Sequence, residues 1–223
     1  MKYLKHFYVD PVTGEAVTTS SLPQNGKTHP AVPGLDVKFW FSDNGVDFCL
    51  SVTDEDDEVS LPGVSYLSES SWFDAAHAEF AKLQEARTHE VFVKTLGIKS
   101  NIVDTWWHPT EISAGVSIKV IQAKAAIEED DDYGASLVAP IVALEAQTRN
   151  MSVKELAQRI IDNFENLVAA EAIISGHRGL LTDSIAAMVF DRTSIETAIE
   201  SFNTLNSFDT MSGFDTILSQ LNM

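Results

Sequence analysis

The amino-acid sequence predicts an α+β protein in which a strand-rich mixed N-terminal domain with one helix precedes an all-α helical hairpin or small bundle. Up to about residue 110, prolines and turn signals separate short runs of alternating apolar and polar residues, a pattern typical of strands. Beyond about residue 117, apolar residues recur with the 3.6-residue period of helices. We therefore expect a mixed domain at 1–112, a helical domain at 113–205 and an apolar docking segment at 206–223.

Short strands are predicted in the first half of the chain. Residues 5–9 form the first, and the Pro- and Gly-containing turn at 10–15 returns the chain to a partner strand at 16–19. A second pair, 37–41 and 47–52, is joined by Asn44-Gly45, which suits a two-residue hairpin turn. The single cysteine, Cys49, lies in the alternating run of the last strand, so we expect a buried, inert thiol and no intrachain disulfide.

The first half also contains one predicted helix. Ser71 is a plausible N-cap, and the apolar residues from Trp72 to Leu83 fall on one helical face. The residues at 89–96 and 98–107 are rich in β-branched and aromatic side chains. We therefore predict that they are further strands.

The second half is predicted to be helical throughout. A helix at 118–127 ends in the acidic run 128–132, and a helix at 135–148 is interrupted by Pro140. Ser152 and Glu155 form a capping box that begins a helix expected to run to Gly176. Two further helices are expected, at 178–190 and at 195–205, the latter after a second capping box at 193–196.

The C-terminal segment has a large apolar residue at nearly every third position. A period of three drifts around a helix, so we expect Gly213 to divide the segment into two pieces. So many apolar side chains must dock either on their own domain or on a neighbouring subunit, and the sequence leaves both open. The candidate interface residues of this segment are Phe208, Met211, Phe214, Ile217, Leu218 and Leu221.

The net charge excludes two classes of partner. The chain has 33 acidic and 15 basic residues in 223, giving a formal charge of −18. A surface this acidic does not attract nucleic acid or anionic membranes. No uncharged apolar run is long enough to span a membrane, and the N-terminus lacks the pattern of a secretory signal.

No catalytic residue, cofactor site or metal site is predicted, and the chain is not expected to be an enzyme. The sequence has no nucleophile elbow, phosphate loop or dinucleotide motif, and its six histidines lack zinc-ligand spacing. The acidic runs 54–58 and 128–132 lack the spacing of a calcium loop, so we expect them to be solvated; adventitious binding of calcium or magnesium between subunits is the alternative.

Two adjacent tryptophans, Trp106 and Trp107, precede His108. Successive side chains of an extended segment face opposite sides, so one tryptophan can pack inside while the other meets the helical half or a partner. Both are therefore candidate interface residues. Stacking of these aromatic rings on a sugar is the alternative, which would make the chain a carbohydrate-binding module.

One stretch resembles a known family. Residues 144–157, followed by Ile160-Ile161 and Gly176-His177-Arg178, resemble a helical module of small tailed-bacteriophage proteins encoded beside tail-fibre and baseplate genes. The resemblance covers about 118–190. It implies a structural component of the phage tail, in the baseplate or tail-fibre region, made in the host cytoplasm and residing in the virion. Such a protein would contact other tail proteins in several copies or as a homo-oligomer. A non-virion assembly chaperone for the fibre is the alternative in this setting.

Overall fold

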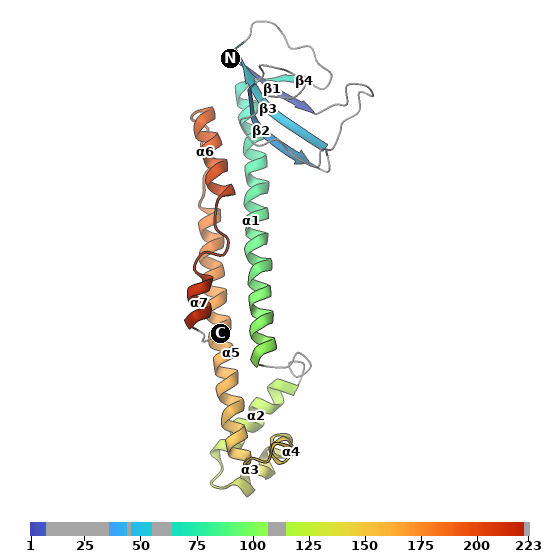
Figure 1. Ribbon diagram of the computed structural model, residues 1–223, viewed down its shortest axis with the longest axis vertical. Helices are drawn as coiled ribbons and strands as arrows, with labels where there is room; N and C mark the ends of the chain where they lie inside the picture. The colour runs from blue at the N-terminus through green and yellow to red at the C-terminus, as the bar shows by residue number, and fades with distance from the viewer. Residues whose placement is uncertain (8–35, 44–45, 55–63, 107–114, 221–223) are drawn as a thin grey trace. The chain divides into compact units, whose positions relative to one another are not determined.

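The computed structural model describes residues 1–7, 36–43, 46–54, 64–106 and 115–220 (Figure 1). Within these ranges, four strands are followed by seven helices. The chain divides into two compact units. Unit 1 consists of Met1–Thr88 and Ser184–Phe208, and unit 2 of His89–Asp183 and Asp209–Met223. The predicted domain boundaries after residues 112 and 205 stay a prediction.

The predicted fold class is wrong in its arrangement, although a mixture of α and β structure is compatible with it. The described residues are predominantly helical, and the two longest helices, α1 (Glu69–Trp106) and α5 (Val153–Ala186), lie in the middle of the chain. The strands predicted at 89–96 and 98–107 are wrong, because α1 continues through them to Trp106. The buried residues of this stretch are spaced by four, three and four positions, so they form a stripe along one side of a helix. Burial of this stripe outweighs the strand preference of the β-branched residues. The stripe consists of Val91, Thr95, Ile98 and Ile102.

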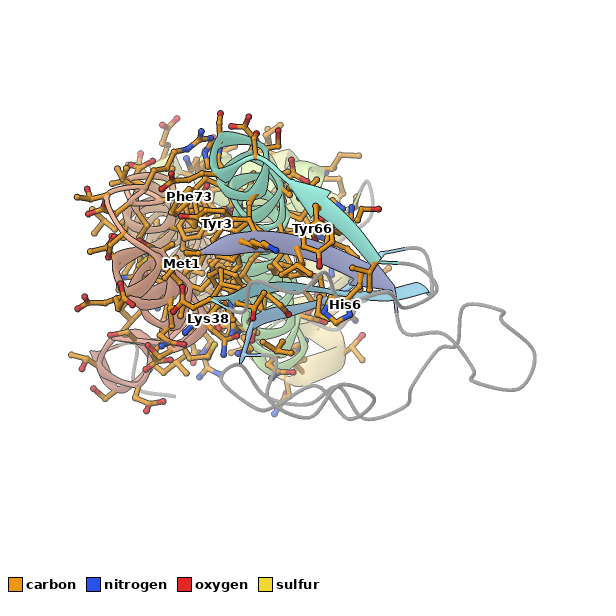
Figure 2. The ribbon with its side chains drawn as sticks, turned by 90° about the horizontal axis from the view of Figure 1, so that it is seen from above. Met1, Tyr3, His6, Lys38, Tyr66 and Phe73 are labelled. Carbon is orange, nitrogen blue, oxygen red and sulfur yellow. The ribbon has the colours of Figure 1, made fainter. Side chains whose placement is uncertain are left out.

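The strands of unit 1 form one small antiparallel sheet in the order β2-β3-β1-β4. Figure 2 shows β1 between β4 and the β2–β3 pair. The strands predicted at 37–41 and 47–52 are confirmed as a pair, whereas the turn at 44–45 and the strand predicted at 16–19 lie outside the described residues. The bounds are β1 (Lys2–Phe7), β2 (Asp36–Asp43), β3 (Val46–Thr53) and β4 (Val64–Leu67).

One face of this sheet carries an aromatic core. Phe202 of α6 (Ile195–Asn206) lies 4.8 Å from the ring of Phe39 on β2, and Phe39 lies 5.7 Å from the ring of Trp72 on α1. Phe202 also contacts three other rings at centroid distances between 5.5 and 5.9 Å: Phe41, Phe80 and Phe190. Phe202 thus joins the sheet, α1 and α6 into one core, because its ring touches all of them.

The opposite face of the sheet buries a small polar cluster. His6 and Cys49 are directly opposite one another on β1 and β3, with the Cys49 sulfur 3.2 Å from Nδ1 of His6. Nε2 of His6 lies 3.0 Å from the Ser51 hydroxyl. Cys49 is fully buried, as its sequence pattern predicts, and this burial raises the pKa of the thiol, although a hydrogen bond with Ser51 opposes the shift.

We predict that Cys49 does not react with a thiol reagent in the folded protein. Only the thiolate is nucleophilic, and burial keeps this thiol protonated and out of reach. Adding Ellman's reagent at about pH 8 is expected to release no chromophore until denaturant is added, when one thiol per chain reacts. Rapid, complete labelling of the native protein would contradict this.

In unit 2, three short helices pack on the first turns of α5 (Figure 1). They are α2 (Gly115–Glu128), α3 (Asp132–Val138) and α4 (Pro140–Arg149). Pro140 begins α4, which confirms the interruption predicted there, since a proline at the first position loses no helical hydrogen bond. Small side chains let the helices approach closely; the core residues are Val120, Ala123, Ala126, Ala135, Ala139, Val142, Ala146, Val153, Leu156, Ala157 and Ile160.

The predicted end of a helix at Gly176 and the separate helix at 178–190 are wrong, because α5 is continuous to Ala186. A glycine inside a helix costs about 1 kcal/mol relative to alanine. Burial of Ile174 and Leu181 on either side of Gly176 outweighs that cost. The predicted start of this helix is supported, because the hydroxyl of Ser152, directly before α5, accepts a hydrogen bond from the N–H of Glu155 at 3.0 Å.

The start of α6 at Ile195 is confirmed, but the capping box predicted at 193–196 is wrong by one residue. Ser194, not Thr193, is the N-cap, and its partner in the capping box is Thr197. No helix in the described part of the chain is both long enough and apolar enough to cross a membrane.

Candidate interaction surface

The structure places the predicted interface residues in different surroundings. Trp106 is the last residue of α1 and its side chain, like all of Trp107, His108 and Leu221, lies outside the described residues. Phe214 is fully buried and Ile217 is 9% exposed, whereas the remaining members of the C-terminal set are half-buried. The sequence leaves open whether this segment docks on its own domain or on a neighbouring subunit. Phe214 and Ile217 pack within their own chain. The interface role stays a prediction. The half-buried residues are Phe208, Met211 and Leu218.

The C-terminal segment is attached to unit 2 by a contact around His177. Gly213 has a φ of +82° and separates α6 from α7 (Phe214–Gln220), which confirms the predicted break. His177 Nε2 lies 2.5 Å from the backbone oxygen of Ser212, and its ring meets Phe214 edge-on at 4.7 Å. Lys94 of α1 donates to the hydroxyl of Thr210 at 2.8 Å. The apolar residues of this segment are therefore partly used by the fold itself.

The clearest free surface lies on α2 and α4. Four large aliphatic side chains on these helices are between 43% and 69% exposed, and we call them the aliphatic face: Ile118, Ile121, Ile141 and Leu144. On each helix the two residues are three positions apart, on the side roughly opposite the buried stripe. The sequence did not reveal this face, because α2 has apolar residues all round and its pattern cannot tell which side is covered.

Polar contacts hold α2 and α4 side by side. Nζ of Lys119 lies 2.9 Å from a carboxylate oxygen of Glu145, and the N–H of Ile141 donates to Oε1 of Gln122 at 3.0 Å. α2 and α4 are therefore neighbours, and each carries its exposed aliphatic pair on the side roughly opposite its own buried stripe.

An acidic border adjoins the aliphatic face. Glu128 continues the outer stripe of α2, since positions 118, 121, 125 and 128 repeat at helical spacing. The acidic run 128–132 is exposed at four of its five residues, as predicted, and two of its carboxylates also cap helices. Asp131 accepts from the N–H of Gly134 at 2.7 Å, and Asp132 accepts from the N–H of Lys154 at 3.0 Å. The fold therefore explains Asp131 and Asp132, whereas Glu128 and Asp130 do not cap a helix in this way.

Asp131→Ala is expected to lower the free energy of unfolding by about 1 kcal/mol, because it leaves an N–H at the start of α3 without its acceptor. Asp130→Ala is the matched control, one residue away and also exposed. It should change stability by less than about 0.5 kcal/mol. Urea unfolding followed by circular dichroism measures both. Equal effects of the two substitutions would show that the cap contributes nothing.

A pocket of about 330 Å³ in unit 1 is a weaker candidate. Its polar groups already hold the chain that leads into α6. The N–H of Asp191 donates to the hydroxyl of Ser201 at 3.1 Å. Hydrogen bonds from the side chain and backbone of Thr193 keep the pKa of Asp191 below its ordinary value. The pocket is lined by Met188, Val189, Asp191, Thr197, Glu200, Ser201 and Thr204.

The described residues contain no group of three His, Cys, Asp or Glu side chains placed to hold a metal ion. Comparison with protein-family models, with curated proteins and with solved structures gives no match. The resemblance to the phage helical module therefore stays an expectation. The aliphatic face and its acidic border are the features from which a function can be inferred.

Proposed function

We propose that the chain is a protein-binding subunit of a larger assembly and that the aliphatic face of α2 and α4 docks its partner. The supporting observation is the exposure of four large aliphatic side chains on two adjacent helices: Ile118, Ile121, Ile141 and Leu144. Single exposed apolar residues need no explanation, whereas a contiguous group with a polar rim marks an interaction site. Burial of each such side chain contributes roughly 1–2 kcal/mol to binding.

The proposed setting is the tail of a bacteriophage, in the baseplate or tail-fibre region. The module that the sequence resembles spans about 118–190, and the aliphatic face lies within that span. In this setting the chain is a structural component that contacts other tail proteins. The negative net charge of 18 means that long-range repulsion opposes contacts between copies, so apolar burial or a basic neighbour must stabilise the assembly.

Cross-linking mass spectrometry of purified phage particles tests this proposal. Lys124 is exposed on α2, about one turn from Ile121, so an amine-reactive cross-linker should join it to another particle protein. If the chain is found only outside mature particles, bound to fibre protein, it is an assembly chaperone. If it is present but Lys124 forms no cross-links to other particle proteins while other lysines do, the aliphatic face is not the docking surface.

A further inference from the structure

Two carboxylates of the acidic border, those of Glu128 and Asp130, cap no helix, unlike those of Asp131 and Asp132. Glu128 and Asp130 lie at the C-terminal end of α2, and the last turn of α2 has no basic residue. Carboxylates at this end oppose the helix dipole, whose negative pole is there. The charge of Glu128 is therefore unfavourable for the isolated chain, and a cation from a partner would relieve both this carboxylate and the dipole of α2. Asp130, which directly precedes the N-cap of α3, adds a second exposed negative charge beside it.

The bases near the face do not cancel this charge. Glu145 lies 2.9 Å from Nζ of Lys119 and 2.6 Å from a guanidinium nitrogen of Arg149, so both bases are held at Glu145 and not at the acidic run. Lys154 Nζ donates to the backbone oxygen of Glu129 at 2.5 Å, on the side where α5 begins. The segment from α2 to α4 has six acidic and three basic residues, so the border stays negative.

The geometry of the face favours a helix as its occupant. Each of these neighbouring helices presents two aliphatic side chains at three-residue spacing. An amphipathic helix carries its apolar residues on one side at matching spacing and can cover exposed pairs of this kind. A second copy of this chain would bring a second acidic border to the same place, and like charges would oppose that contact.

Resting on the docking function proposed above, we infer that the partner segment is a basic amphipathic helix. Its apolar side covers Ile118, Ile121, Ile141 and Leu144, and its lysines or arginines lie against Glu128 and Asp130.

The full-length chain, with its isoleucine methyl groups labelled, is titrated with a synthetic Leu/Lys peptide of roughly five helical turns. A Leu/Glu peptide and a scrambled Leu/Lys peptide of the same composition are the controls. We expect the Leu/Lys peptide to shift the methyl signals of Ile118, Ile121 and Ile141. The Leu/Glu peptide should cause no shift, and the scrambled peptide should bind at least about tenfold more weakly because its apolar residues do not form one face.

Three variants separate the two proposals. Ile121→Ser with Leu144→Ser should weaken binding at least about tenfold, whereas Leu180→Ser on α5, which removes a side chain of similar exposure (66%), should leave it unchanged. Glu128→Gln with Asp130→Asn should weaken binding severalfold and reduce its dependence on salt. Glu128 and Asp130 are chosen because they cap no helix. Their substitution should therefore leave the fold intact.

Each failure has its own meaning. If the aliphatic variant binds as well as the unaltered chain, the docking function is overturned. If the aliphatic variant is impaired but the Leu/Glu peptide binds equally well, or the charge variant has no effect, the docking function stands and the basic partner is wrong. If sedimentation shows a dimer that Ile121→Ser with Leu144→Ser abolishes, the occupant is a second copy and the basic partner is again wrong.

Discussion

Phe202→Ala is expected to lower the free energy of unfolding of unit 1 by about 3–5 kcal/mol. Phe202 is 6% exposed and is the ring through which the aromatic side chains of β2, α1 and the chain before α6 meet. Alanine leaves a cavity that the sheet and helices cannot both close, because each is held by its own hydrogen bonds. A substantial loss of the native near-ultraviolet circular dichroism should accompany the loss of stability, since the neighbouring rings lose their fixed packing.

The matched control is Phe92→Ala, which removes the same side chain where it is 43% exposed on α1. Its effect should be about 1 kcal/mol or less, because the ring makes a cation–π contact with Arg178 but fills no closed core. Urea unfolding of both variants compares them. Equal destabilisation by the two substitutions would contradict the central place of Phe202.

Gly213→Ala is expected to detach the C-terminal segment from unit 2. The φ of +82° costs an alanine about 1–2 kcal/mol. In addition, its Cβ would lie 2.8 Å from Cε1 of the His177 ring, closer than real contacts allow. Because His177 also contacts Ser212 and Phe214, a shift of its ring disturbs both contacts. Hydrogen exchange in α7 should rise by at least tenfold, as expected for a loss of about 1.4 kcal/mol or more.

Gly176→Ala controls for the loss of a glycine in the same unit. Nothing lies within 4 Å of the position that its Cβ would take, and it is inside a helix. Alanine should therefore stabilise α5 by about 0.5–1 kcal/mol and leave α7 attached. In the double variant Gly213→Ala with His177→Ala, hydrogen exchange in α7 should be no slower than in His177→Ala alone. Unchanged exchange of α7 in Gly213→Ala would mean that the His177 contact does not hold the segment.

The sequence predicted helix and strand boundaries where a local chemical signal marks them. Pro140 begins α4 because a proline lacks an N–H, Ser152 and Glu155 mark the start of α5, and Gly213 breaks the tail because it adopts a positive φ. Each signal acts through the backbone of its own turn. Tertiary packing does not need to be known for such positions.

The sequence failed where packing decides the structure. Residues 89–106 are β-branched and aromatic enough to suggest strands, yet they continue α1 because burial of Val91, Ile98 and Ile102 outweighs propensity. Gly176 is a helix-ending signal by itself, and α5 passes through it for the same reason. Local preference is worth less than about 1 kcal/mol per residue, which is below the value of one buried aliphatic side chain.

The aliphatic face was not predictable for a related reason. Ile118, Ile121, Ile141 and Leu144 are apolar, and so are the residues on the covered side of the same helices. Hydrophobic pattern identifies apolar residues but does not say which of two apolar sides is buried when both exist. The C-terminal segment shows the converse: its apolar residues were candidates for an interface, and Phe214 and Ile217 are covered by the chain itself.

Hydroxyl-radical footprinting of the free chain and of the chain in its assembled state measures the central claim most directly. Oxidation of Ile121 and Leu144, which are 68% and 69% exposed in the free chain, should fall severalfold on assembly. Leu180, 66% exposed on α5, serves as the internal reference and should change little. Equal oxidation of Ile121 and Leu144 in both states would contradict docking at the aliphatic face.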